Sequence, residues 1–128
     1  MDIHESGEDY LEAILKLQKR LGQVRSIDIV GELGYSKPSV SIAMKRLREN
    51  GYITMAADGY ITLTELGLSI ADRIYTRHRL LTRFFIALGV DEATAASDAC
   101  KVEHDLSDVT FEKLKQHASR HLGETVLL

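Results

Sequence analysis

The sequence predicts a mainly α-helical protein in which a winged helix-turn-helix unit is followed by a second helical unit. Three observations support this fold class: two short helical segments joined by a glycine-containing turn, a β-hairpin signal directly after them, and a long helical segment without proline. The chain has 128 residues, of which 45% are hydrophobic and 27% are charged, so it can bury a core beneath an ordinary polar surface.

Helical periodicity runs from about residue 5 to Gly22 and places an apolar residue at every third or fourth position. The members of this stripe are Tyr10, Ile14, Leu17 and Leu21. A short helix is expected to follow, with Ser26 as its N-cap and Gly34 as its stop signal. These two segments supply the first part of the predicted helix-turn-helix.

The third helix should begin after its N-cap Ser36 and turn its apolar positions toward the core. Those inward positions are Val40, Met44 and Leu47. Two runs rich in β-forming residues, 51–55 and 60–63, then flank a turn at 57–59 and predict a hairpin. A hairpin directly after a helix-turn-helix is a wing.

The rest of the chain is expected to be helical. A helix over 66–88 contains no proline and is followed by Gly89. Two further helices are expected, one over 91 to about 107 and one over 111 to about 122, with Asp108 as the cap between them. Since no flexible linker interrupts the sequence, the long helix should join the two halves without a break.

The third helix is the expected recognition helix for DNA. Its segment 36–50 holds four basic residues and one acid, although the whole chain carries a net charge of −3. Basic side chains bind phosphates, serines allow close approach of the backbone, and apolar side chains can contact thymine methyl groups. The expected DNA-binding residues are Ser36, Lys37, Pro38, Ser39, Ser41, Ile42, Lys45 and Arg46. The alternative is a solvated amphipathic helix, which the preceding helix and the wing disfavour.

Six residues in three separate segments have side chains that ligate metal ions. They are Asp9, Glu12, His78, Cys100, Glu103 and His104. The first two are spaced i, i+3 and the last three i, i+3, i+4, so each group is expected on one helix face. Each residue alone has an ordinary explanation as a helix-dipole acid, a surface residue or a small buried cysteine. Together, thiolate, carboxylate and imidazole suit a transition-metal ion.

These segments resemble the diphtheria toxin repressor and manganese transport regulator family of metal-dependent repressors. The resemblance covers nearly the whole chain and is carried by residues 8–12, 36–41, 77–81 and 98–104. It implies a DNA-binding winged helix domain over 1–70 and a helical metal-binding and dimerisation domain over 71–128. It also implies a homodimer that binds operator DNA with a divalent metal as co-repressor, and it supports the six residues as its ligands.

The chain departs from both branches of this family. Acids at Asp9 and Glu12 resemble the manganese branch, whereas Cys100 resembles the iron branch. Thr82 and Ala96 stand where the iron branch has an acid and a histidine of a second site, so that site is expected to be absent. A thiolate is a soft ligand and favours Fe(II), Co(II) or Zn(II) over Mn(II). On physiological grounds we expect Fe(II) first and Mn(II) next, with Co(II) or Zn(II) possible in vitro.

The sequence leaves two alternatives to a metal-dependent repressor. A winged-helix regulator could sense a small organic ligand or a protein, with the acids merely capping helices. A catalytic metal site is disfavoured because six protein ligands leave little room for substrate, so no enzyme and no catalytic residue is expected. The single cysteine cannot form an internal disulfide, which indicates a cytoplasmic protein, and no membrane partner is expected.

A dimer is expected both with and without metal. The last helices carry more apolar residues than a small winged domain alone can cover. They include Leu106, Val109, Phe111 and Leu114.

Overall fold

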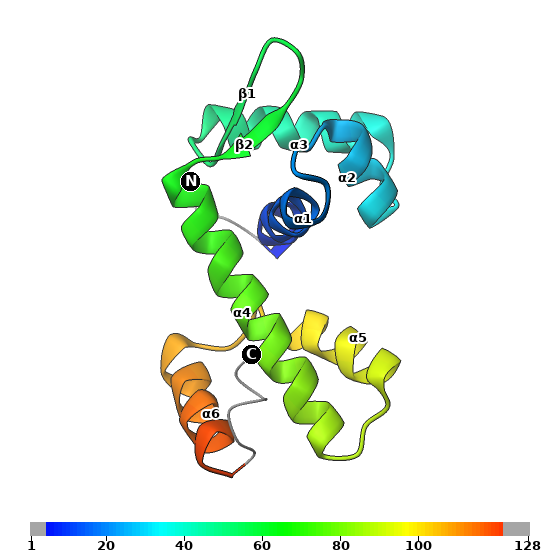
Figure 1. Ribbon diagram of the computed structural model, residues 1–128. Helices are drawn as coiled ribbons and strands as arrows, with labels where there is room; N and C mark the ends of the chain where they lie inside the picture. The colour runs from blue at the N-terminus through cyan, green and yellow to red at the C-terminus, as the bar shows by residue number, and fades with distance from the viewer. Residues whose placement is uncertain (1–4, 122–128) are drawn as a thin grey trace. The chain divides into compact units, whose positions relative to one another are not determined.

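The computed structural model describes residues 5–121. The chain divides into two compact units, Met1–Asp72 and Arg73–Leu128. The described residues are mainly helical with one small hairpin, which confirms the predicted class (Figure 1). Among them, no helix combines the length and apolar character that crossing a membrane requires.

The first unit is built around its N-terminal helix. Its elements are α1 (Glu5–Leu21), α2 (Ser26–Leu33), α3 (Lys37–Glu49), β1 (Ile53–Met55), β2 (Ile61–Leu63) and the start of α4 (Glu65–Ala87). Helix α1 contacts α2, α3 and β2. Leu11 and Ile14 of α1 and Ile29 of α2 are fully buried, so the apolar stripe of α1 forms the centre of this core.

Helix α3, the expected recognition helix, begins as predicted. The Ser36 hydroxyl accepts a hydrogen bond from the Ser39 backbone N–H at 3.2 Å, and Pro38 lies in the first turn, where its missing N–H is harmless. The predicted inward positions are buried. They are Val40, Met44 and Leu47.

The predicted wing is present. Strands β1 and β2 pair antiparallel, with Ile53 opposite Leu63. Gly59, at a φ of 89°, closes the turn between them and donates its N–H to the Ala56 carbonyl at 2.9 Å. The hairpin is also tied to the segment before α2, because Ile61 donates its N–H to the Val24 carbonyl at 2.7 Å.

Helix α4 starts in close contact with the segment between α3 and β1. The Thr64 hydroxyl accepts the Gly67 N–H at 3.2 Å and donates to the Gly51 carbonyl at 2.6 Å. A Cβ atom on residue 67 would lie 2.0 Å from the Tyr52 carbonyl oxygen. Only glycine therefore fits in this turn of α4.

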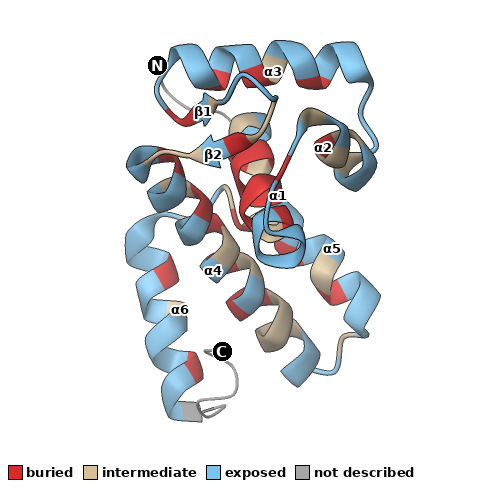
Figure 2. Cartoon of the chain, turned by 45° about the horizontal axis from the view of Figure 1, so that its top comes forward, coloured by how far each residue is buried: buried red, intermediate tan, exposed pale blue. Residues whose placement is uncertain are grey.

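The second unit holds the rest of α4 together with α5 (Glu92–Val102) and α6 (Asp108–His121). Helices α5 and α6 flank this part of α4, and their buried residues lie on the inner faces (Figure 2). Leu80, Phe111 and Ala118 form a core cluster with the half-buried Phe84 and Leu106 against it. Phe111 therefore serves this internal core, whereas Val109 remains 73% exposed.

Two predictions in the first unit were wrong. The N-cap of α2 is Arg25 rather than Ser26, and the Asp28 carboxylate accepts the Arg25 backbone N–H at 2.9 Å. This acid satisfies a backbone donor at the start of the helix, so no serine cap is required. Leu21, expected in the apolar stripe, is 51% exposed because it lies in the last turn of α1.

The boundaries of the last two helices also differ from the prediction. Helix α5 ends at Val102 instead of near residue 107, so Glu103 is its C-cap and His104 follows it. Helix α6 begins at Asp108, because the Ser107 hydroxyl accepts the Thr110 N–H at 3.1 Å and caps it. The predicted end near residue 122 lies outside the described residues.

Candidate metal and DNA-binding sites

Three of the six predicted metal ligands lie close to a fourth, the Glu103 carboxylate, in the second unit. The Glu103 side chain is fully buried, and its Oε2 lies 2.8 Å from His78 Nδ1. Its Oε1 lies 3.6 Å from His104 Nε2. The sulfur of Cys100 is within 4.8 Å of a Glu103 carboxylate oxygen. The predicted single helix face is wrong in detail, since only Cys100 of the three late residues lies within α5.

The cluster of His78, Cys100, Glu103 and His104 fits a divalent transition metal. Oε1 of Glu103 is buried and has no hydrogen-bond partner among the residues that the structure describes. A buried carboxylate oxygen in that state is unfavourable unless a cation faces it. Cys100 is exposed and forms no disulfide, so it is not the small core residue of the ordinary explanation. Imidazole, carboxylate and thiol together are the donor set of iron, cobalt or zinc sites.

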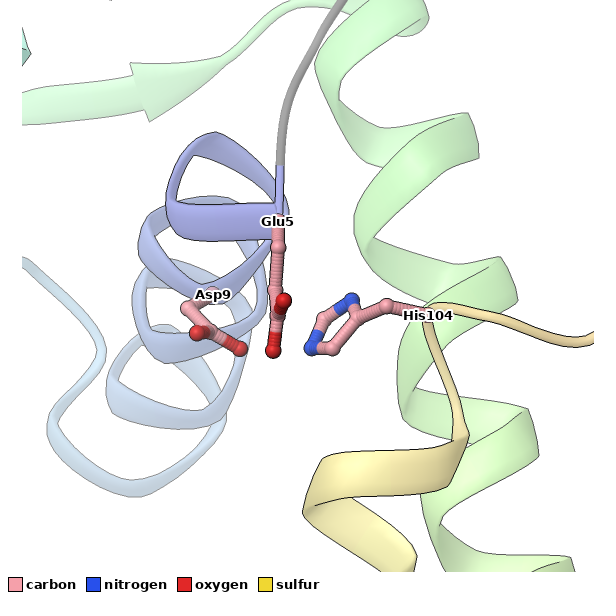
Figure 3. Close-up of side chains that lie close together, drawn as sticks. All are labelled: Glu5, Asp9 and His104. Carbon is pink, nitrogen blue, oxygen red and sulfur yellow. The ribbon is translucent and has the colours of Figure 1, made fainter.

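The two remaining predicted ligands lie on α1, in the first unit. Glu12 is buried, with one carboxylate oxygen 3.7 Å from Lys16 Nζ, and Asp9 is half-buried. Glu5 was not among the residues predicted from the sequence. One of its carboxylate oxygens lies within 4.8 Å of a carboxylate oxygen of Asp9. Figure 3 shows both carboxylates on the same side of α1. The spacing i, i+4 between Glu5 and Asp9 was the signal that could have identified it.

All eight predicted DNA-binding residues are exposed on or next to α3. The Ser36 and Ser39 hydroxyls are 2.8 Å apart, so these two serines also stabilise the start of the helix. Ile42 is 56% exposed, which leaves its apolar side chain accessible. This large exposed hydrophobe next to basic residues suits a surface that contacts DNA bases.

A groove runs along α3 between the start of α2 and the wing. Its lining residues are Ser26, Ser41, Ile42, Met44, Lys45, Arg48 and Met55. The Lys45 ammonium lies 3.9 Å from a Glu49 carboxylate oxygen. Within the described part of the chain, the Arg48 guanidinium has no ion pair or side-chain hydrogen bond. Arg48 is thus a further candidate for DNA contact, three residues after Lys45 on the same stripe of α3.

Comparisons with known proteins identify both halves of the chain. Residues 2–61 match the iron dependent repressor, N-terminal DNA binding domain, and residues 64–120 match the iron dependent repressor, metal binding and dimerisation domain. The chain belongs to the iron-dependent repressor family. It is also 32% identical over 114 residues to the transcriptional regulator MntR of Escherichia coli O157:H7, covering 89% of this chain and 74% of that protein.

Two further relatives support membership of the iron-dependent repressor family. An HTH-type transcriptional regulator of Methanocaldococcus jannaschii is 36% identical over 113 residues, covering 87% of this chain and 90% of its own. The structure of the manganese regulator SloR has a TM-score of 0.78 and 28% identity, covering 93% of this chain. This chain spans 55% of the SloR chain, about half of its length.

Family membership confirms several predictions. The iron-dependent repressors are metal-dependent transcriptional regulators and not enzymes, with a DNA-binding domain followed by a metal-binding and dimerisation domain. All eight predicted DNA-binding residues fall within the first matched domain, as do Asp9 and Glu12. His78, Cys100, Glu103 and His104 fall within the second.

Proposed function

We propose that this chain is a homodimeric repressor that binds operator DNA when it is loaded with Fe(II), with Mn(II) as the second candidate. The observation that carries this proposal is the buried Glu103 carboxylate, which His78 contacts on one oxygen while the other oxygen has no hydrogen-bond partner among the described residues. We expect the protein to act in the cytoplasm and to control genes of metal homeostasis.

The proposed ligands are the six residues predicted from the sequence. They are Asp9, Glu12, His78, Cys100, Glu103 and His104. A bound divalent ion would offset the negative charge of the carboxylates that hold it. Asp9 and Glu12 belong to the unit that carries the recognition helix, and the other four belong to the second unit. If metal binding is to promote repression, the arrangement of the protein that binds DNA must bind metal more tightly than the arrangement that does not.

The choice of iron over manganese depends on Cys100. Its exposed thiol lies within 4.8 Å of a Glu103 oxygen, so both side chains can serve one ion. A thiolate favours Fe(II), Co(II) or Zn(II) over Mn(II) more than a carboxylate does. SloR is described as a manganese regulator, which keeps Mn(II) as the second candidate.

DNA recognition is assigned to α3 and the groove beside it. Ser36, Lys37, Pro38, Ser39 and Ser41 lie at the N-terminal end of α3, where recognition helices meet base edges. Ile42 suits a thymine methyl group, whereas Lys45 and Arg46 suit phosphates. In a dimer the two recognition helices would bind half-sites about 34 Å apart or a multiple of that distance.

The test is an anaerobic titration with Fe(II) and with Mn(II). Metal stoichiometry is followed by calorimetry, and DNA binding is followed on the promoters of the protein's own gene and of neighbouring transport genes. We expect saturable metal binding and metal-dependent DNA binding that a chelator reverses. DNA binding that is equally tight in chelator would exclude a metal co-repressor and favour a regulator that senses another ligand.

The dimer is tested in the same preparations. Sedimentation at micromolar concentration should give a dimer in chelator and in metal, because residues 64–120 match a metal binding and dimerisation domain. An apo monomer would contradict this part of the proposal.

A further inference from the structure

Arg77 is a buried cation whose side chain reaches the segment between α5 and α6. It is 3% exposed, and its guanidinium donates to the Glu103 carbonyl at 3.1 Å, to the Leu106 carbonyl at 2.6 Å and to Asp108 Oδ1 at 2.5 Å. It also lies over the Phe111 ring, 5.2 Å from its centroid. One side chain of α4 thus fixes the segment where α5 ends and α6 begins.

The two backbone carbonyls that Arg77 holds lie on either side of His104. This segment is not regular helix, and Asp105 N–H bonds to the Val102 carbonyl at 3.1 Å in a tight turn. The last carbonyls of a helix need partners outside it. Here the Arg77 guanidinium donates hydrogen bonds to the Glu103 and Leu106 carbonyls, and it thereby fixes the backbone that carries Glu103 and His104.

His78, the residue after Arg77, contacts the side chain of Glu103. His78 Nδ1 contacts Glu103 Oε2 at 2.8 Å, while Arg77 binds the Glu103 backbone carbonyl. Adjacent residues of α4 therefore hold both the main chain and the carboxylate of Glu103. Metal affinity depends on such preorganisation, because ligands that are already positioned lose less freedom on binding.

General packing does not explain Arg77. The cluster of Leu80, Phe111 and Ala118 already joins α4 to α6 through apolar contacts. Burying a guanidinium is unfavourable unless each of its donors is satisfied. The Nε atom of Arg77 is buried with no hydrogen-bond partner among the described residues. A charged residue at this position is thus a poor choice for stability alone.

We propose that Arg77 is a positioning residue for the metal site, which sets the backbone geometry of Glu103 and His104. This inference rests on the proposed metal-binding function. It concerns only the second unit, in which Arg77 and the residues that it contacts all lie. Arg77 itself ligates nothing and acts through the two residues after α5.

The test compares Arg77→Lys with wild type in anaerobic Co(II) titrations of the full chain. Lysine keeps the charge, but a single ammonium cannot match the planar fork that reaches two carbonyls and a carboxylate. We expect Co(II) affinity to fall by about tenfold or more, as for other groups that orient metal ligands, and the Co(II) absorption spectrum to change. The matched control is Arg73→Lys, since Arg73 lies 4.0 Å from Asp108 Oδ1 and should leave affinity and spectrum unchanged.

Two outcomes separate this inference from the proposed function. If wild type binds Co(II) and Arg77→Lys gives the same affinity and spectrum, the positioning role is excluded and the metal site stands. If wild type fails to bind Co(II), Fe(II) and Mn(II), the proposed function fails and this inference fails with it.

A second measurement needs no substitution and applies if the lysine variant does not fold. In protein labelled with ¹⁵N-arginine, Zn(II) loading should slow hydrogen exchange of the Arg77 guanidinium, because the bound ion holds its two carbonyl acceptors in place. Equal exchange in chelator and in Zn(II) would overturn the positioning role.

Discussion

The His78 imidazole and the Glu103 carboxylate lie 2.8 Å apart, although 25 positions separate them in the sequence. This contact joins α4 to the end of α5 and brings two predicted metal ligands together within one compact unit. It leaves the second carboxylate oxygen of Glu103 buried without a hydrogen-bond partner among the described residues. The same residue should therefore be unfavourable for the stability of the metal-free protein and essential for metal binding.

Glu103→Gln tests this relationship. Glutamine keeps the shape of the side chain and removes its charge, so the metal-free protein should be as stable as wild type or more stable. Metal affinity should fall by roughly 100-fold or more, because the buried anionic ligand is lost. Thermal unfolding in chelator and in Mn(II) measures both effects, and a metal-induced rise in Tm as large as that of wild type would contradict the assignment.

Cys100→Glu tests the preference for iron. A carboxylate is harder than a thiolate, so this variant should respond to Mn(II) at lower free concentrations than wild type does. Operator affinity is measured with Fe(II), Mn(II), Co(II) and Zn(II), each at a fixed free concentration. His104→Ala is the comparison, because it removes a ligand without replacing it and should weaken the response to every metal. An unchanged ranking of metals in Cys100→Glu would remove Cys100 from the ligand set.

Arg48→Ala tests the groove beside α3. Loss of a phosphate contact should weaken binding to many DNA sequences alike and reduce the slope of log affinity against log salt by about 0.9. Arg46→Ala should behave in the same way, whereas Ser39→Ala should alter sequence preference. Lys113→Ala, on α6 in the second unit, is the control with an unchanged slope. A slope for Arg48→Ala equal to that of wild type would show that Arg48 does not contact DNA.

Gly67→Ala tests the close contact between α4 and the segment before the wing. The added methyl group would lie 2.0 Å from the Tyr52 carbonyl oxygen, so one of the two backbones must move. We expect a loss of about 1–3 kcal/mol in the free energy of unfolding, measured with urea. Gly31→Ala in α2 is the matched control, because its added methyl group meets nothing within 4 Å and should be neutral or stabilising. Equal stability of the two variants would contradict this packing.

Asp91 gives α5 a pH-dependent start. Hydrogen bonds from Thr94 lower the pKa of this carboxyl in the folded protein. The stabilisation is therefore complete above the ordinary pKa of an aspartate, about 4, and is lost as the pH falls through the lowered value. Asp91→Asn keeps a cap that does not titrate, so the advantage of wild type should be full at pH 6 and should shrink as the pH is lowered below about 4. Urea unfolding across this range measures the difference, and a constant difference would contradict the assignment.

The sequence by itself determined the order of the helices and the presence of the wing. Local signals explain this success: Ser36 and Pro38 mark the start of α3, and the period of its apolar residues gave the buried side of that helix. Resemblance to a known family supplied the role of each segment, and the matched domains confirm that family. The six ligands and the eight DNA contacts remain predictions at the level of single residues.

The tertiary structure decided where α5 ends and which groups face Glu103. Helical spacing predicted that α5 would continue past His104, but the Arg77 guanidinium binds the carbonyls of Glu103 and Leu106 from another helix. These two contacts join Arg77 to residues that are 26 and 29 positions later in the sequence, and no local sequence pattern encodes them. For the same reason the sequence predicted Glu103 as a ligand but gave no sign that its carboxylate is buried beside His78. Periodicity predicts the face of a helix, whereas only packing decides which side chains meet there.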